Sequence, residues 1–187
     1  MASLSERGWR ADQKILHDEA DHHVLQSCIV ALGHLSYLEG VQTICGFSSH
    51  PSADLRHAVA VALGGMADED SNAASALLKL MQDPDDDVRD WATFGIGVLS
   101  ELDTPAIRDA LYQRLDDGHF ETHCEAMTGL GKRKDMRVLP ALLKYFNEGW
   151  EGPSSAEAAT VLLELDSEPT DWTPEMFAKA LRKKYSK

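Results

Sequence analysis

Apolar residues recur at helical spacing along the chain, in short segments separated by turns rich in proline, glycine or aspartate. The clearest segment follows Asp83-Pro84. Proline lacks a backbone N–H and suits the first turn of a helix, and we expect Asp83 to cap it. The segment over about 85–100 therefore predicts a helix with one buried stripe, formed by Val88, Ala92, Ile96 and Leu99.

The same criteria predict a helix in every other apolar segment. Thr104-Pro105 and Thr173-Pro174 each place a capping residue before a proline at the first helical position. The sequence contains no run of alternating β-branched residues and no Asn-Gly pair, so it predicts neither a strand nor a hairpin. The further helices are expected over about 3–18, 20–38, 41–47, 52–67, 71–82, 104–115, 119–131, 138–146, 153–165 and 173–185.

The segments repeat with a period of 31 to 34 residues. Arg56 falls 33 residues before Arg89, and Leu63-Gly64 falls 33 residues before Ile96-Gly97. Related small-residue steps occur at 31–33, 129–131 and around Ala159. A period of this length is typical of stacked-repeat proteins, in which each helix pair buries its apolar face against the next.

The motif Asp-x-x-Val-Arg followed by Ala and a Leu-Gly step resembles the HEAT-like repeats found in phycobilisome lyases. The resemblance is strongest at 85–99 and 54–66, and looser at 20–35, 119–131 and 153–165. It implies a right-handed α-solenoid. We therefore predict a single all-α domain of about five helix pairs over 3–38, 41–67, 70–100, 104–131 and 135–165, closed by a capping helix over 173–185.

The chain is acidic, with 31 acidic and 18 basic residues and a net charge of −13. Five of the basic residues lie in 179–187, which contains no acid, so the remainder is more acidic still. Such a surface repels phosphate backbones, and we expect no direct nucleic-acid partner. The same field attracts a basic protein partner.

Cysteine usage and hydropathy predict the compartment. The cysteines Cys28, Cys45 and Cys124 are odd in number and form no CxxC motif, which favours a reduced environment. The N-terminus lacks the apolar run of a signal peptide, and the longest apolar stretch, 58–63, is too short to cross a bilayer. We expect a cytoplasmic protein that is monomeric when free.

Candidate catalytic or metal-binding chemistry is sparse. His119 and His123 are four residues apart, but zinc needs further ligands, so we interpret them as exposed or capping residues. Another HEAT-like family, deoxyhypusine hydroxylase, builds a di-iron site from His-Glu pairs. Here no histidine is directly followed by glutamate. We therefore predict no metal, no cofactor and no enzymatic activity.

Two arginines at equivalent repeat positions, Arg56 and Arg89, have a structural interpretation. Each could bond an acidic residue of an adjacent turn and join neighbouring repeats. We favour this role over ligand binding.

The candidate site is the concave groove on the second helix of each pair. Acidic and aromatic side chains together are typical of a protein-binding surface. Trp91 replaces the small Ala58 of the preceding repeat, so it lies either at the groove edge or in the core. The predicted partner-binding residues are His57, Asp90, Trp91, Phe94, Glu125, Met127, Glu157 and, in a glycine-bearing turn, Trp150.

These features predict a non-enzymatic scaffold that holds a basic protein in an acidic groove. HEAT-like bacterial immunity proteins of similar size and charge suggest a specific form, an inhibitor of a toxin such as a nuclease. The alternative is a lyase-like protein or cofactor chaperone that holds a chromophore or metal in the same groove.

Overall fold

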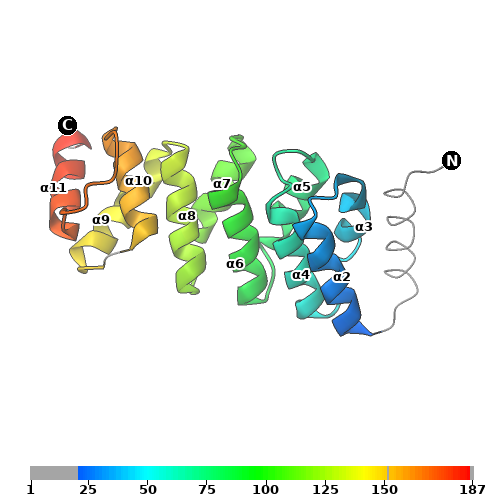
Figure 1. Cartoon of the computed structure of the whole chain (residues 1–187). Coiled ribbons are helices and arrows are strands. Elements are labelled where there is room, and N and C mark those ends of the chain that lie inside the picture. Colours follow the sequence, from blue (N-terminus) through cyan, green and yellow to red (C-terminus); the bar gives the residue numbers. More distant parts are fainter. Residues whose placement is uncertain (1–20, 151, 186–187) are drawn as a thin grey trace. The chain divides into compact units, whose positions relative to one another are not determined.

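The structure is a computed structural model that describes residues 21–150 and 152–185 (Figure 1). Every regular element among these residues is helical, which confirms the predicted all-α class. The chain divides into two compact units, Met1–Leu102 and Asp103–Lys187, which are described separately below. The helix predicted over 3–18 lies outside the described residues.

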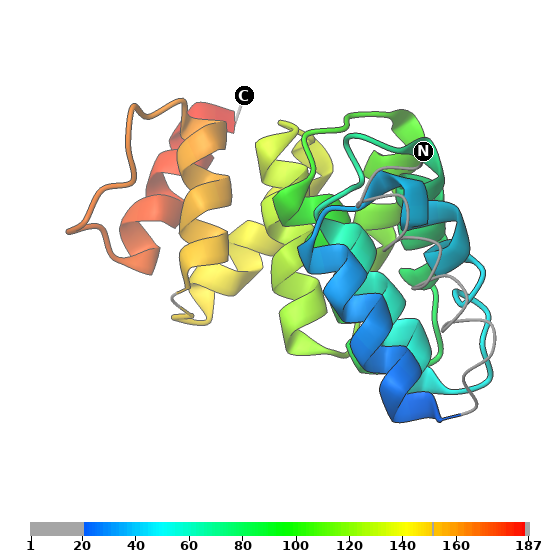
Figure 2. The ribbon, with the colours of Figure 1, turned by 45° about the vertical axis from the view of Figure 1, so that its right-hand side comes forward.

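The first unit consists of two layers of helices. α2 (His22–His34), α4 (Ala53–Gly64) and α6 (Asp86–Phe94) pack side by side, and α3 (Val41–Cys45) and α5 (Ser71–Leu80) pair in the second layer (Figures 1 and 2). A 3₁₀ turn at Leu38–Gly40 precedes α3. The core between the layers is apolar and includes Ile29, Leu55, Leu63, Leu77 and Ile96.

The second unit repeats this arrangement. α8 (Phe120–Lys132) packs against α10 (Pro153–Leu163), and α7 (Pro105–Arg114) packs against α8. A 3₁₀ turn at Met136–Val138 leads into α9 (Leu139–Asn147). The C-terminal helix α11 (Pro174–Tyr185) packs against α9 and α10, as expected of a helix that covers the end of a stack (Figure 2).

The helix predicted over 85–100 differs from the observed one at both ends. Asp85, not Asp83, is the N-cap of α6, and its carboxylate accepts a hydrogen bond from the Val88 N–H at 3.2 Å. After Phe94 the backbone widens into a π-helical turn over Gly95–Leu99, closed by the Ser100 N–H bonding to Gly95 O at 3.1 Å. The other helices predicted within the described residues exist, with ends shorter by one to four residues in most cases.

Glycine allows the helices of each layer to approach very closely. A Cβ added at Gly95 would lie 2.9 Å from the Gly64 Cα, and one at Gly33 would lie 2.5 Å from the Ala62 Cα. In the second unit a Cβ at Gly131 would lie 2.5 Å from the Ala158 Cβ and 2.6 Å from its Cα. Real Cβ atoms do not approach backbone this closely, so these positions exclude any side chain.

Arg56 joins two successive repeats of the first unit. Its Nε and Nη2 donate to the two carboxylate oxygens of Asp83, both at 2.7 Å, and its Nη1 donates to the carbonyls of His50 and Pro51. The arginine and aspartate side chains are only 13% and 7% exposed. A bidentate pair with little exposure is among the stronger charge-assisted contacts in proteins. Asp83 is therefore occupied by Arg56, which explains why Asp85 caps α6 instead.

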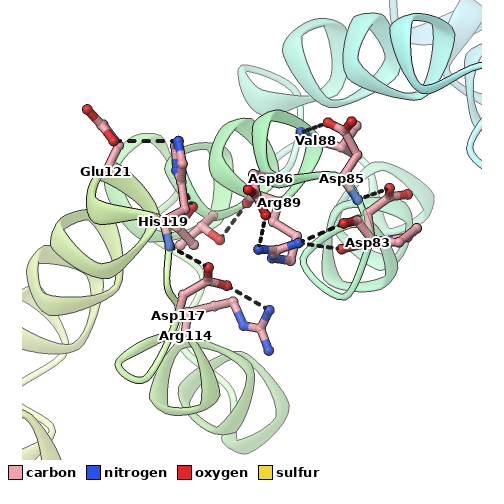
Figure 3. Close-up of polar contacts among 12 residues, drawn as sticks. Asp83, Asp85, Asp86, Val88, Arg89, Arg114, Asp117, His119 and Glu121 are labelled. Atoms are coloured by element: carbon pink, nitrogen blue, oxygen red, sulfur yellow. Dashed lines mark hydrogen bonds and ion pairs between the residues drawn. The ribbon is translucent and has the colours of Figure 1, made fainter.

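Arg89 repeats part of this geometry one repeat later. Its Nη1 donates to the carbonyls of Asp83 and Pro84, as Arg56 does to the carbonyls six and five residues before it. Its Nη2 bonds the Asp86 carboxylate of its own helix at 2.5 Å (Figure 3). The predicted acidic partner in an adjacent turn is thus confirmed for Arg56. For Arg89 the contact with Asp86 lies within one helix.

Two opposing effects act on the pKa of the Asp83 carboxyl. Burial raises it, but the hydrogen bonds from Arg56 and from the Asp85 N–H, with the charge of Arg89, lower it more. The resulting pKa lies below the ordinary value of an aspartate. In the second unit, bonds from Arg137 similarly lower the pKa of Asp135 against the effect of burial.

We predict that Gly131→Ala lowers the free energy of unfolding by about 1–3 kcal/mol, because the new methyl group overlaps the Ala158 backbone. Alanine would otherwise favour a helix by roughly 0.5–1 kcal/mol, so a loss identifies the clash. Urea unfolding measures the change. Gly118→Ala, where an added Cβ meets nothing within 4 Å, is the matched control and should cause no loss. Equal stability of both variants would contradict the close approach.

We predict that Arg56→Ala lowers the free energy of unfolding by roughly 2–3 kcal/mol, because it leaves the buried Asp83 carboxylate without its main partner. Chemical denaturation followed by circular dichroism measures this loss. Arg182→Ala is the control, since that exposed side chain makes one bond, to the Asn147 Oδ1. Its effect should stay below about 0.5 kcal/mol. Comparable losses in the two variants would show that Arg56 has no special role.

The lowered pKa of Asp83 predicts a pH dependence. The contacts of its carboxylate contribute fully above the unfolded-state pKa of about 3.9 and are lost as the pH falls through the lower folded-state pKa. The free energy of unfolding should therefore fall more steeply below about pH 4 in the wild type than in Asp83→Asn. Urea titrations between pH 6 and pH 3 measure both slopes. Identical slopes would mean that Asp83 has the same proton affinity folded and unfolded.

Candidate functional site

An exposed tryptophan lies between two other rings on the α4–α6 layer of the first unit. The Trp91 side chain is 39% exposed. Its ring contacts His57 of α4 edge-to-face, with centroids 5.8 Å apart, and Phe94 of α6 in a similar arrangement, also at 5.8 Å. Edge-to-face geometry is favourable for aromatic pairs and holds the indole in one orientation.

The packing of α4 on α6 explains why Trp91 faces outward. The two helices run parallel, because His57 contacts Trp91 and, further along both helices, Gly64 meets Gly95. Ala58, the counterpart of Trp91 in the preceding repeat, is completely buried. An indole does not fit where only small residues separate the helices. Of the two sequence-based alternatives for Trp91, the structure supports the partly exposed one.

Three carboxylates lie about one helical turn before these rings along α4 and α6. Asp54 and Asp87 are exposed in the first turns of α4 and α6, and Asp90 is half-buried one turn further along. The first unit has 16 acidic and 6 basic residues, a net charge of −10. We use the name acidic–aromatic face for the surface formed by Asp54, His57, Asp87, Asp90, Trp91 and Phe94.

The remaining predicted site residues lie in the second unit, on three different elements. Glu125 is half-buried on α8, and Glu157 is exposed on α10. Met127 was expected to face the groove, but its side chain is completely buried. The reason is the close contact of α8 with α10 at Gly131, which turns the middle of α8 into interior.

Trp150 contacts a second aromatic group, in the second unit. Its ring centroid lies 5.6 Å from Phe120 and 6.2 Å from Tyr145, and the last two are 6.4 Å apart. These rings line a pocket of about 430 Å³, here named the α7–α9 pocket. Its wall also includes Tyr112, Leu115, Asp116, His123, Arg137, Pro140, Ala141, Lys144 and Glu148.

Sequence reasoning missed Phe120, Tyr112 and Tyr145 as parts of one pocket. The available signal was Phe120, a large apolar residue that lies outside the apolar stripe of its helix and is 47% exposed. Tyr145 is largely buried, and burial together with the neighbouring Cys124 raises its pKa to about 12. Its hydroxyl therefore stays protonated at neutral pH.

The two histidines considered as metal ligands make structural contacts. His119 lies at the start of α8, with Nδ1 3.1 Å from the Thr122 hydroxyl and Nε2 3.5 Å from Glu121 (Figure 3). The His123 Nδ1–H donates to the Leu115 carbonyl at 2.6 Å. Within residues 21–150 and 152–185, no three His, Cys, Asp or Glu side chains gather as metal ligands would.

Among the described residues, no helix combines the length and the apolar character that crossing a bilayer requires.

Comparison with known proteins agrees with the repeat architecture. A family model described as HEAT repeats matches residues 13–97 and, in a second overlapping segment, 74–163. The chain belongs to the HEAT-repeat family. The predicted HEAT-like resemblance is thereby confirmed, and with it the α-solenoid class.

Similar proteins include Protein YibA from Escherichia coli strains K12 and O157:H7, each 38% identical over 91 residues. That segment is 49% of this chain but only 31% of the YibA length. The X-ray structure of E. coli YibA superposes with a TM-score of 0.75, covering 98% of this chain and 70% of the other at 23% identity. This likeness shows the fold, a stack of helical repeats.

Proposed function

We propose that this HEAT-repeat protein is a non-enzymatic scaffold that binds a basic protein on its acidic–aromatic face. The observation that supports the proposal best is the partly exposed Trp91, oriented by His57 and Phe94, on helices that carry aspartates one turn away. Tryptophan held in a fixed orientation is a frequent anchor of protein interfaces, whereas aspartates around it accelerate the approach of a positive partner.

The charge of the first unit supports a basic partner in particular. A net charge of −10 on one unit creates a long-range attraction that a neutral interface would lack. A toxin such as a nuclease carries a basic surface for its own substrate, so this chemistry suits an immunity protein that blocks one. Binding in the cytoplasm, before such a toxin reaches nucleic acid, would complete this role.

We predict that Trp91→Ala weakens binding to a basic protein partner by about 2 kcal/mol, because it removes the anchor. The immobilised protein would first capture its partner from a lysate, and surface plasmon resonance would then measure both rate constants. Asp90→Lys should mainly slow association, and this association should also slow as salt rises.

The matched control is Glu69→Lys, which makes the same charge change at an exposed position after the end of α4. It should leave the dissociation rate unchanged and slow association less than Asp90→Lys does. Affinity that survives every change on the acidic–aromatic face would refute the proposed surface. A stoichiometric chromophore or metal in the purified protein would instead favour the cofactor-chaperone alternative.

A further inference from the structure

The α7–α9 pocket has the composition of a site for a positively charged ligand. Three rings, from Phe120, Tyr145 and Trp150, lie mutually within 6.4 Å. Phe120 and Trp150 are 47% and 50% exposed, so their surfaces are accessible from solvent. The negative face of an aromatic ring attracts cations, and tryptophan does so most strongly.

The charged residues of the wall include two carboxylates, Asp116 and Glu148. Neither of them forms an ion pair with any residue in the described part of the chain. The cations of the wall are Arg137 and Lys144. The effective charge of the pocket wall therefore depends on how far Arg137 and Lys144 are already neutralised by other residues.

Arg137 is paired with two carboxylates of the protein itself. Its Nε and Nη2 donate to Asp135, the Nη2 bond being 2.6 Å long, and its Nη1 donates to Asp109 at 2.6 Å. Its guanidinium carbon lies 5.0 Å from the centre of the Tyr112 ring, so one cation already stacks on an aromatic face here. Two carboxylates therefore already offset the positive charge that Arg137 would offer a bound anion.

The other nitrogen-bearing groups give an anion little support. His123 uses Nδ1 to donate to the Leu115 carbonyl. Lys144 is exposed on α9 and is one ammonium group against the two carboxylates. Rings and carboxylates together favour a cation over a phosphate or a carboxylate ligand.

We propose that the α7–α9 pocket binds an organic cation of the alkylammonium or guanidinium class, with Trp150 and Phe120 against the charged head and Asp116 and Glu148 beside it. A volume of about 430 Å³ accommodates a ligand of this size. The site lies in the second unit, so it goes beyond the proposed protein-binding role of the acidic–aromatic face.

Choline and its neutral isostere 3,3-dimethyl-1-butanol test the proposal directly, because they have nearly the same shape and differ in charge. Isothermal titration calorimetry of the full chain should show choline binding at least about tenfold more tightly than the alcohol. Arginine amide is titrated as a second cationic ligand. Tighter binding of choline than of arginine amide would indicate a quaternary ammonium ligand, and the reverse order a polypeptide side chain.

Variants then locate the site. Trp150→Leu keeps an apolar side chain but removes the ring, and should weaken choline binding about five- to tenfold. The double variant Asp116→Asn with Glu148→Gln should weaken it and reduce its dependence on salt. The matched controls, Trp91→Leu in the other unit and Glu175→Gln on α11, should leave choline affinity unchanged. Circular dichroism checks that each variant stays folded.

Equal affinities for choline and the alcohol would overturn the proposal, because the pocket would then be merely apolar. So would binding of inorganic phosphate in preference to choline, or choline binding that Trp150→Leu and the double variant leave intact. Trp91→Leu affects only the acidic–aromatic face. A negative choline experiment would therefore not count against the protein-binding role, and a negative protein-binding experiment would not count against this pocket.

Discussion

Close backbone contact between neighbouring helices is the constraint on which the other features of this protein depend. Helices usually pack with axes 8–10 Å apart, separated by side chains. At Gly95 and Gly131 there is no room for even one methyl group. Because each contact fixes the rotation and register of both helices, it also decides which neighbouring side chains turn inward and which turn outward. Trp91 turns outward under this constraint, and Met127 turns inward.

The two units use charge in different ways. The first has 16 acidic and 6 basic residues, and the buried pair of Arg56 with Asp83 neutralises only one of the acids. Its remaining carboxylates produce a field suited to long-range attraction. The second has 15 acidic and 12 basic residues, many of them in local pairs such as Arg108 with Asp103 and Arg137 with Asp135. In the second unit we expect charge to act over a short range, inside the α7–α9 pocket.

Aromatic residues follow the same division. In the first unit the indole of Trp91 is oriented by a histidine and a phenylalanine on an open helical face, as suits contact with a large partner. In the second unit Trp150 belongs to a loop and closes a pocket with rings from α8 and α9. That arrangement suits a small charged group. One composition, acid with aromatic, thus underlies both of the proposed kinds of recognition.

The sequence by itself determined the helices and their repeat. Helical periodicity, proline at first turns and a constant period are local signals, so the helices of the described residues were predicted correctly within a few residues. Capping was less certain, because Asp83 and Asp85 are equally good caps in isolation. Only the contact of Arg56 with Asp83, 27 residues apart in the chain, decided between them.

Tertiary structure alone decided the candidate sites. Trp91 and Met127 lie on corresponding helices of neighbouring repeats, but their exposure depends on how closely the next helix approaches, which is a property of the helix pair. The α7–α9 pocket shows the same limit, because its rings come from separate segments, each with an unremarkable local pattern. Local pattern specified which residues form helices, whereas packing between distant segments specified which side chains remain available for a ligand.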